Sequence, residues 1–216
     1  DLSPEVLVVE LPRDPSLYVP TLMNLTCFGG LGLTEEDKQK GRMYSEDKSR
    51  RKLQQSATDL TEYLRMLNIS ITFREVERST VARVAQLTQK TNQFNVTTRR
   101  YTEEDIVDFS DSERYRLISL QLTDKFGDSG LTGVAIVEMV AQVGWRIDSF
   151  LLSCRILGKG AEEALLTYIA NEAKKDSALT LRGEFISSTK NKPAEKLYKN
   201  HGFRRLETDG ALERWE

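Results

Sequence analysis

The sequence has little cysteine, histidine or proline: two cysteines, one histidine and five prolines among 216 residues. Two cysteines supply no disulfide framework and suit a reducing compartment, so we expect a cytoplasmic protein. Long apolar runs are missing, which argues against a membrane-spanning helix, and no signal peptide is recognisable. The formal net charge of −2 lacks the basic excess of nucleic-acid-binding domains. Neither a membrane nor a nucleic acid is therefore an expected partner.

The remaining composition is that of a globular protein, with 39% hydrophobic and 30% charged residues. Apolar periodicity predicts the order of the elements. We expect helices at 35–52, 59–67 and 80–91, a short helix capped by Thr102, and strands at 6–12, 69–75, 116–122, 132–140, 145–154 and 179–186. Turn residues at 124–130 predict a hairpin loop between two of these strands. A domain junction is expected just after residue 67.

The most informative stretch is residues 154–161, Cys-Arg-Ile-Leu-Gly-Lys-Gly-Ala, between an apolar strand and an amphipathic helix. A loop at a helix N-terminus offers unpaired N–H groups and the positive end of the helix dipole, which suit a phosphate. Gly158 and Gly160 let such a ligand approach the backbone closely. With Cys154 directly upstream, the stretch suggests chemistry on a phosphopantetheine arm, from coenzyme A or a carrier protein. A simple strand-to-helix turn is the alternative.

A second motif, Asn-x-x-Ala-x-x-Leu-Tyr-x-x-x-Gly-Phe, occupies residues 191–203. Together with Arg-x-x-Gly-x-Gly at 155–160, it resembles the pattern of GNAT acyltransferases over about residues 69–216. The resemblance implies an α/β (α+β) fold whose mixed, mostly antiparallel sheet is flanked by helices. The positions that match phosphopantetheine contacts of that family are Arg155, Gly158, Gly160 and Asn191, and the general-acid position is Tyr198.

Three segments, residues 86–101, 124–131 and 152–158, are similar to the signature of FkbH-type proteins. In that family a haloacid-dehalogenase-like (HAD-like) phosphatase half precedes a GNAT-like half. The resemblance implies that a glyceryl unit from 1,3-bisphosphoglycerate is loaded onto an acyl carrier protein through a cysteine thioester, in polyketide or related biosynthesis. It also implies that residues 1–67 are the C-terminal remnant of the phosphatase domain and residues 68–216 the acyltransferase domain.

The phosphatase motifs themselves are absent: the sequence has neither the Asp-x-Asp nucleophile motif nor the later Asp-Asp metal motif. We therefore expect no metal and no phosphatase activity in this portion, and the upstream phosphatase half becomes an expected partner besides the carrier protein. A typically acidic carrier needs a local basic patch. Candidates are Arg99 with Arg100 and Arg204 with Arg205, although each pair also fits an ordinary solvated surface.

Cys154 is the expected nucleophile, whose thiolate accepts the acyl group before the carrier thiol takes it. The alternative is a small core residue, and strand alternation places Cys154 and Arg155 on opposite faces unless a bulge intervenes. The expected substrate contacts are Asn92, Gln93, Asn95 and Asp124, with Asp128 as a possible base. Helix capping and turn formation are the ordinary explanations for these polar residues.

Two other functions fit the same sequence. An acetyl-CoA-dependent N-acetyltransferase would need Tyr198 and the nucleotide part of coenzyme A, but not Cys154. A non-catalytic docking module would hold the carrier protein for the upstream phosphatase, and its binding would survive loss of Cys154.

Overall fold

The computed structural model describes residues 9, 11–23, 35–141 and 143–216. The chain divides into two compact units, residues 1–49 and 50–216. The described part of the first unit holds a 3-10 turn at Pro15–Leu17, helix α1 (Tyr18–Met23) and most of α2 (Glu35–Ser56), which continues into the second unit. The strand expected at 6–12 falls largely outside the described residues, and Cys27 lies outside them entirely.

Helices α2 and α3 (Leu60–Leu67) confirm two expected helices. Opposite charges four residues apart stabilise α2, as in the 3.3 Å pair between Arg42 and Glu46. The Asp59 side chain caps α3 by accepting a hydrogen bond from the Glu62 N–H. The assignment of residues 1–67 to a phosphatase remnant stays a prediction.

One eight-stranded sheet forms the second unit, in the order β1-β3-β4-β5-β6-β8-β7, with β2 pairing β5. The strands are β1 (Ser70–Glu75), β2 (Phe94–Asn95), β3 (Tyr115–Asp124), β4 (Gly127–Val140), β5 (Gly144–Leu152), β6 (Thr180–Ile186), β7 (Arg205–Asp209) and β8 (Leu212–Trp215). Only β5 and β6 are parallel among these pairs. The expected mixed, mostly antiparallel sheet is therefore confirmed.

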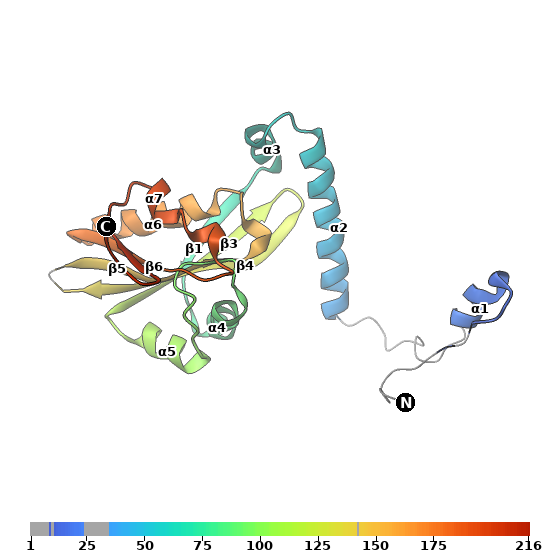
Figure 1. Cartoon of the computed structure of the whole chain (residues 1–216), viewed down its shortest axis with the longest axis horizontal. Coiled ribbons are helices and arrows are strands. Elements are labelled where there is room, and N and C mark those ends of the chain that lie inside the picture. Colours follow the sequence, from blue (N-terminus) through green and yellow to red (C-terminus); the bar gives the residue numbers. More distant parts are fainter. Residues whose placement is uncertain (1–8, 10, 24–34, 142) are drawn as a thin grey trace. The chain divides into compact units, whose positions relative to one another are not determined.

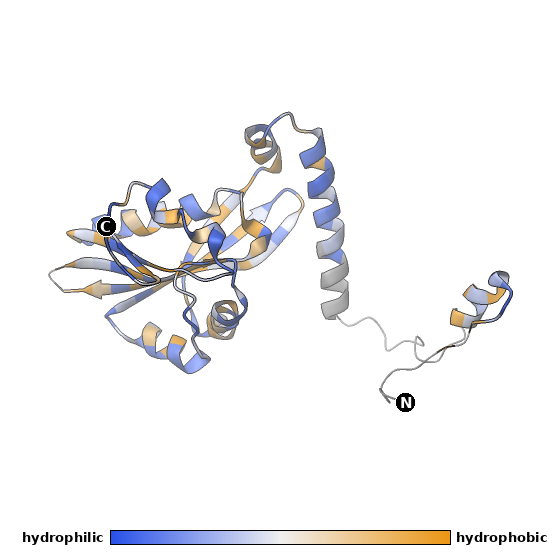
Figure 2. Cartoon of the chain, viewed as in Figure 1, coloured by the Kyte–Doolittle hydropathy of each residue, from blue (hydrophilic) through white to orange (hydrophobic). Residues whose placement is uncertain are grey.

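Helices cover both faces of this sheet: α6 (Ala161–Lys175) and α7 (Leu197–Asn200) on one, α4 (Val81–Lys90) and α5 (Glu103–Asp111) on the other (Figure 1). Each pair of helices has its own apolar core with the strands beneath it. Successive strand residues point to opposite faces, so Val134 and Ile136 of β4 join one core while Ala135 and Val137 join the other. Figure 2 shows hydrophobic residues along the strands of this sheet. Each fully buried leucine or isoleucine in these cores contributes about 1.5–3 kcal/mol.

Two element boundaries differ from the sequence expectations, and both matter for the site. The strand expected to reach Cys154 ends at Leu152, and Cys154–Ile156 forms a 3-10 turn. The strand-alternation argument therefore does not apply, and the turn leaves both Cys154 and Arg155 exposed. The hairpin loop expected at 124–130 shrinks to two residues, because β3 and β4 extend until Asp124 pairs with Gly127.

A short segment lies between β5 and β6. Residues 144–147 of β5 pair with residues 180–183 of β6, and the two strands separate beyond these pairs. Residues 94–96, which we call the wedge, fill the gap: β2 pairs with the end of β5, and the Ile186 N–H donates to the Val96 carbonyl oxygen at 2.8 Å. The sequence analysis missed this strand, because a two-residue strand has no periodicity to detect.

Candidate functional site

Cys154 lies exposed at the end of β5, beside a pocket of about 310 Å³. The walls of the pocket come from one face of α4 with the turn after it, and from the end of β5 with the turn that follows. Its polar lining includes Arg83, Lys90, Asn92, Gln93, Cys154 and Arg155. The fold thus brings Asn92, Gln93, Cys154 and Arg155 together, all of which the sequence analysis had named as candidates.

The sequence analysis missed two cationic members of this pocket, Arg83 and Lys90. With Leu87 they lie at helical spacing along one face of α4. Arg83 is half-buried and donates hydrogen bonds to the Gln86 side chain and the Leu131 carbonyl oxygen. Burial and the nearby positive charge of Arg155 both lower the pKa of Arg83. The sequence did offer one signal for Arg83: it is a basic residue that lies one helical turn before the apolar Leu87 of α4.

Asn92 is held in place by Arg100. The Arg100 guanidinium donates to the Asn92 side-chain oxygen and to the carbonyl oxygens of Thr88 and Gln89 at the end of α4. Within the described residues, the Asn92 amide nitrogen has no acceptor, so it is available to a ligand in the pocket. Arg100 therefore stabilises the turn after α4. It is also exposed, so its use in carrier docking stays a prediction.

Asn95 and Asn191 are both fully buried. The Asn191 amide donates to the carbonyl oxygens of Asn95 and Ile186, at 2.9 Å each. The Asn95 side chain accepts from the Thr98 N–H at 2.9 Å and donates to the Thr91 carbonyl oxygen at 3.3 Å. Both side chains hold the wedge in place, and neither lines the Cys154 pocket. Their predicted ligand contacts stay predictions.

Asp124 and Asp128 also lie outside the lining of that pocket. Asp124 is buried and pairs with Arg50 at 2.8 Å and Lys159 at 3.4 Å. Burial favours its neutral form, but the hydrogen bond and charge of Arg50 outweigh this, and the pKa of Asp124 is lowered. Asp128 is exposed and accepts from Gln121 at 2.6 Å, in a turn-forming arrangement. The structure does not bring either carboxylate to Cys154.

The loop between Cys154 and α6 has a geometry that fits a phosphate. Gly158 and Gly160 have φ angles of +73° and +76°, a region that glycine adopts readily. Within the described part of the chain, the N–H groups of Gly158, Gly160 and Ala161 have no acceptor. A Cβ on either glycine would meet no atom within 4 Å, so the space before the loop is open. The expected phosphate site is therefore sterically and chemically feasible.

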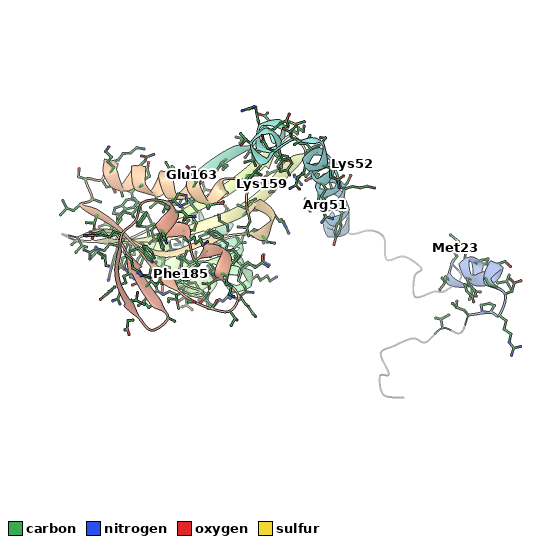
Figure 3. All side chains as sticks on the ribbon, turned by 45° about the horizontal axis from the view of Figure 1, so that its top comes forward. Met23, Arg51, Lys52, Lys159, Glu163 and Phe185 are labelled. Carbon is green, nitrogen blue, oxygen red and sulfur yellow. The ribbon has the colours of Figure 1, made fainter. Side chains whose placement is uncertain are left out.

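Acidic residues in the first turn of α6 act against that site. Glu162 and Glu163 follow Ala161 directly, and Figure 3 labels Glu163 beside Lys159 at this end of the helix. Negative side chains already stabilise the positive helix terminus, which weakens its attraction for a further anion. Phosphate binding there depends mainly on the free N–H groups.

Tyr198 lies in the core between α7 and the sheet and is only 1% exposed. Its ring packs so closely on β6 that a Cβ at Gly183 would lie 2.3 Å from it. Among the described residues no group forms a well-aligned hydrogen bond with its hydroxyl, although the backbone N–H of Glu184 interacts with it. Burial, with the negative charges of Glu184 and Asp148, raises the pKa of Tyr198, so the phenol is neutral at physiological pH. It is absent from the lining of the Cys154 pocket.

A second group of charges crosses β4, β5 and β6, and we call it the charge network. Its members are Arg99, Glu138, Arg146, Asp148 and Glu184. Arg99 pairs with Asp148 and lies 2.7 Å from Glu184, while Arg146 pairs with Glu138 and lies 3.2 Å from Glu184. Because Arg99 is committed to this network, its charge is already neutralised by protein carboxylates.

The second basic pair considered for carrier docking also has internal partners. Arg204 lies 3.8 Å from Glu216, and Arg205 lies 3.4 Å from Glu213. Both arginines remain exposed, so their use in docking stays a prediction.

Another cavity, of about 570 Å³, lies around the turn between β4 and β5, at the opposite end of β5 from Cys154. Among the described residues that line it, Asp176 alone is titratable, and Asp176 pairs with Arg116 at 2.9 Å. This cavity therefore offers little for catalysis. In the described residues, no helix has the length and apolarity needed to cross a membrane, and no group of three or more potential metal ligands occurs.

Comparison with known proteins identifies the fold. No protein-family model matches the sequence, and no curated protein matches it. Among solved structures, the ribosomal-protein-S18-alanine N-acetyltransferase of Escherichia coli matches at TM-score 0.50 and 21% identity, over 68% of this chain and 90% of that one. The GNAT domain of S. lividans PAT matches at TM-score 0.52 and 14% identity, over 66% and 87%.

Ard1 from Thermoplasma volcanium matches at TM-score 0.51 and 20% identity, over 67% of this chain and 93% of that one. This chain has a GNAT-like fold. The fold expectation from the two motifs is therefore confirmed, whereas identities this low carry no information about substrate. The GNAT-like fold places Cys154 at the end of β5, directly before the glycine loop and α6.

Proposed function

We propose that the chain is an acyltransferase that holds an acyl group on Cys154 and passes it to the phosphopantetheine thiol of an acyl carrier protein. The observation that carries this proposal is the exposed Cys154 thiol in a pocket that also contains Asn92, Gln93 and Arg155. A cysteine with only a packing role would be expected in the core.

The reaction transfers one acyl group twice. It moves first from an oxygen or sulfur atom of the donor to the Cys154 sulfur, and then to the carrier thiol. The Cys154 thiolate attacks the acyl carbonyl of an activated donor, a new C–S bond forms, and the donor leaving group departs with its bonding electron pair. The Asn92 amide is suited to donate a hydrogen bond to the oxyanion that develops. The carrier thiolate then attacks the enzyme thioester, and the Cys154 thiolate leaves. No oxidant or reductant is needed.

The glycine loop would hold the phosphate of the arriving arm. The free N–H groups of Gly158, Gly160 and Ala161, and the open space before them, support this assignment. Free coenzyme A carries the same arm, so it is a further possible ligand of the loop.

The acyl unit that we propose is glyceryl, derived from 1,3-bisphosphoglycerate. Support comes from the similarity of residues 86–101, 124–131 and 152–158 to FkbH-type proteins. The same similarity supports a HAD-like phosphatase half as the upstream partner, with natural-product biosynthesis as the setting.

A second candidate is direct acetyl transfer from acetyl-CoA to an amine. It is favoured by the Tyr198 hydroxyl, which is buried without a well-aligned hydrogen bond among the described residues and could therefore serve a ligand. The core position of Tyr198 is the difficulty, because the hydroxyl must first become accessible to the thiolate.

Intact-protein mass spectrometry separates these functions. The chain would be incubated with a glyceryl N-acetylcysteamine thioester, then with a phosphopantetheinylated carrier protein. We expect a glyceryl adduct on the wild-type chain that moves to the carrier. Cys154→Ala should show no adduct and carrier loading reduced at least about 100-fold, as expected on removing a covalent nucleophile. Cys27→Ala is the matched control and should behave as wild type.

Equal carrier loading by wild type and Cys154→Ala would contradict the proposal. Acetylation of an amine from acetyl-CoA that survives Cys154→Ala would establish the second candidate instead. Carrier binding by both proteins without any loading would indicate a docking module.

A further inference from the structure

We propose that Arg83, Lys90 and Arg155 form an anion-binding subsite inside the Cys154 pocket, which holds a phosphate group carried by the acyl donor. The identity of the donor as an acyl compound rests on the proposed function. The existence of the subsite does not, because anion binding beside a cysteine is measurable without acyl transfer.

The first argument is the absence of negative charge around these cations. In the part of the chain that the structure describes, no carboxylate forms an ion pair with Arg83, Lys90 or Arg155. The other half-buried arginines behave differently: Arg99, Arg116 and Arg146 each contact two or more carboxylates. A half-buried arginine beside a second, equally unneutralised arginine is stabilised by an anion between them.

The second argument is the position of the cations relative to the thiol. Arg83 and Lys90 approach from one wall of the pocket, on α4, and Arg155 from the other wall, adjacent to Cys154. Leu87 and Leu152 also line the pocket, and of the three cations Arg83 is the half-buried one. Guanidinium groups bind phosphate through paired hydrogen bonds, and such contacts strengthen where water is partly excluded.

The third argument concerns the source of the phosphate. The arm of a carrier protein has its phosphate far from its thiol, and the glycine loop already offers free N–H groups for that phosphate. The Cys154 pocket, at about 310 Å³, is the size of a small metabolite site. A phosphate within a few bonds of the acyl carbonyl therefore fits the subsite better than the phosphate of the arm.

Alkylation of Cys154 tests the subsite directly. Iodoacetate and iodoacetamide differ mainly in negative charge, so the ratio of their rates reports the charge environment of the thiol. The rates would be followed by mass spectrometry of the Cys154 peptide, with N-acetylcysteine as the reference. We expect the iodoacetate-to-iodoacetamide ratio to be raised at Cys154, and Arg83→Gln to lower it about fivefold, the effect of one unit charge at about 4 Å under bulk-water screening.

Arg78→Gln is the matched control, because Arg78 lies just before α4 and pairs at the surface with Asp111 at 2.6 Å. It should leave the ratio unchanged, and Arg83→Lys should retain most of it. Thermal unfolding of each variant would show that the fold is intact. A ratio equal to the reference in the wild type, or one that Arg83→Gln does not change, would overturn the subsite.

Protection from alkylation identifies the source of the phosphate. Inorganic phosphate and 3-phosphoglycerate should slow alkylation of Cys154 in the wild type and lose this effect in Arg83→Gln. S-methyl phosphopantetheine should protect less, and its effect should persist in Arg83→Gln. Stronger, Arg83-dependent protection by S-methyl phosphopantetheine would overturn the assignment to the acyl donor and give the anion site to the phosphopantetheine arm. No protection by any of these compounds would overturn the subsite itself.

The two proposals fail in different ways. An Arg83-dependent alkylation ratio without any acyl adduct would leave the subsite standing and remove the thioester function. An adduct on Cys154 with a ratio equal to the reference would do the opposite.

Discussion

The Cys154 pocket and the charge network are both built around arginines, and they differ in what faces those arginines. In the charge network Glu138, Asp148 and Glu184 contact Arg99 and Arg146 from within the fold. In the pocket Arg83, Lys90 and Arg155 share the lining with an exposed thiol, and Arg83 is close enough to Arg155 to feel its charge, with no carboxylate partner in the described residues. Charges that a protein neutralises itself have structural roles, whereas charges left unneutralised in a pocket indicate a ligand.

The same comparison shows that an arginine in a candidate segment is not by itself a sign of a ligand site. Arg99 and Arg155 are both arginines in segments that the sequence analysis marked as functional. Arg99 is held between two carboxylates, and Arg155 lies beside Arg83 and Cys154. Substitutions that remove one charge from each region should therefore affect different properties of the protein.

The largest effect is expected from Glu184→Ala in the charge network. Glu184 accepts hydrogen bonds from Arg99 at 2.7 Å, Arg146 at 3.2 Å and Arg214 at 3.4 Å, so its removal leaves several cations poorly neutralised. We expect the free energy of unfolding to fall by about 3 kcal/mol. Urea unfolding would measure it, with exposed Glu207→Ala as a control at less than about 1 kcal/mol. A similar small loss for Glu184→Ala would show that this network is not structural.

An intermediate effect is expected from acid. Burial favours the neutral forms of Glu138 and Glu184, but hydrogen bonds and charges from Arg146 and Arg99 respectively outweigh it, and both pKa values are lowered. Their contribution to stability is complete above the ordinary glutamate pKa of about 4.3 and is lost as the pH falls through the folded-state values. Urea midpoints measured from pH 7 to pH 3 should therefore drop less in Glu184→Gln than in wild type. Parallel curves would contradict this assignment.

The smallest effect on stability is expected from Arg155→Gln in the Cys154 pocket. Since Arg155 has no carboxylate partner among the described residues and repels Arg83, the free energy of unfolding should change by less than about 0.5 kcal/mol, towards greater stability. Thermal and urea unfolding at low and high salt would measure it. A loss above about 1.5 kcal/mol would show that Arg155 is a structural cation and would remove the contrast between the two regions.

Much of the fold was predictable from the sequence. The apolar periodicity of α4 and α6 records burial on one side of each helix, and the apolar runs of β3 and β4 record burial on both faces of the sheet. Such patterns are visible without tertiary information. The capping box at Thr102 and Asp105 likewise forms as expected, since it depends on residues three positions apart.

The site was predictable only in part, because its members belong to different elements. Cys154 and Asn92 were found as local motifs, but their meeting depends on how α4 packs at the end of β5. Arg83 was missed because a charged residue on a helix is ordinarily solvated, and only the fold shows which cations lack a partner. The burial of Asn95 and Asn191 was likewise invisible, since the hydrogen bond that joins the Asn191 amide to the Asn95 carbonyl oxygen spans 96 residues.

That last separation has a consequence for how the protein assembles. The wedge accepts hydrogen bonds from Asn191 and Ile186. Both donors come later in the chain than the wedge by about half the length of the domain. Closing so long a loop has an entropic cost that local hairpins do not have. A ribosome-bound chain that stops before Ile186 therefore already contains every residue that lines the Cys154 pocket, but its wedge still lacks the hydrogen bonds from Ile186 and Asn191.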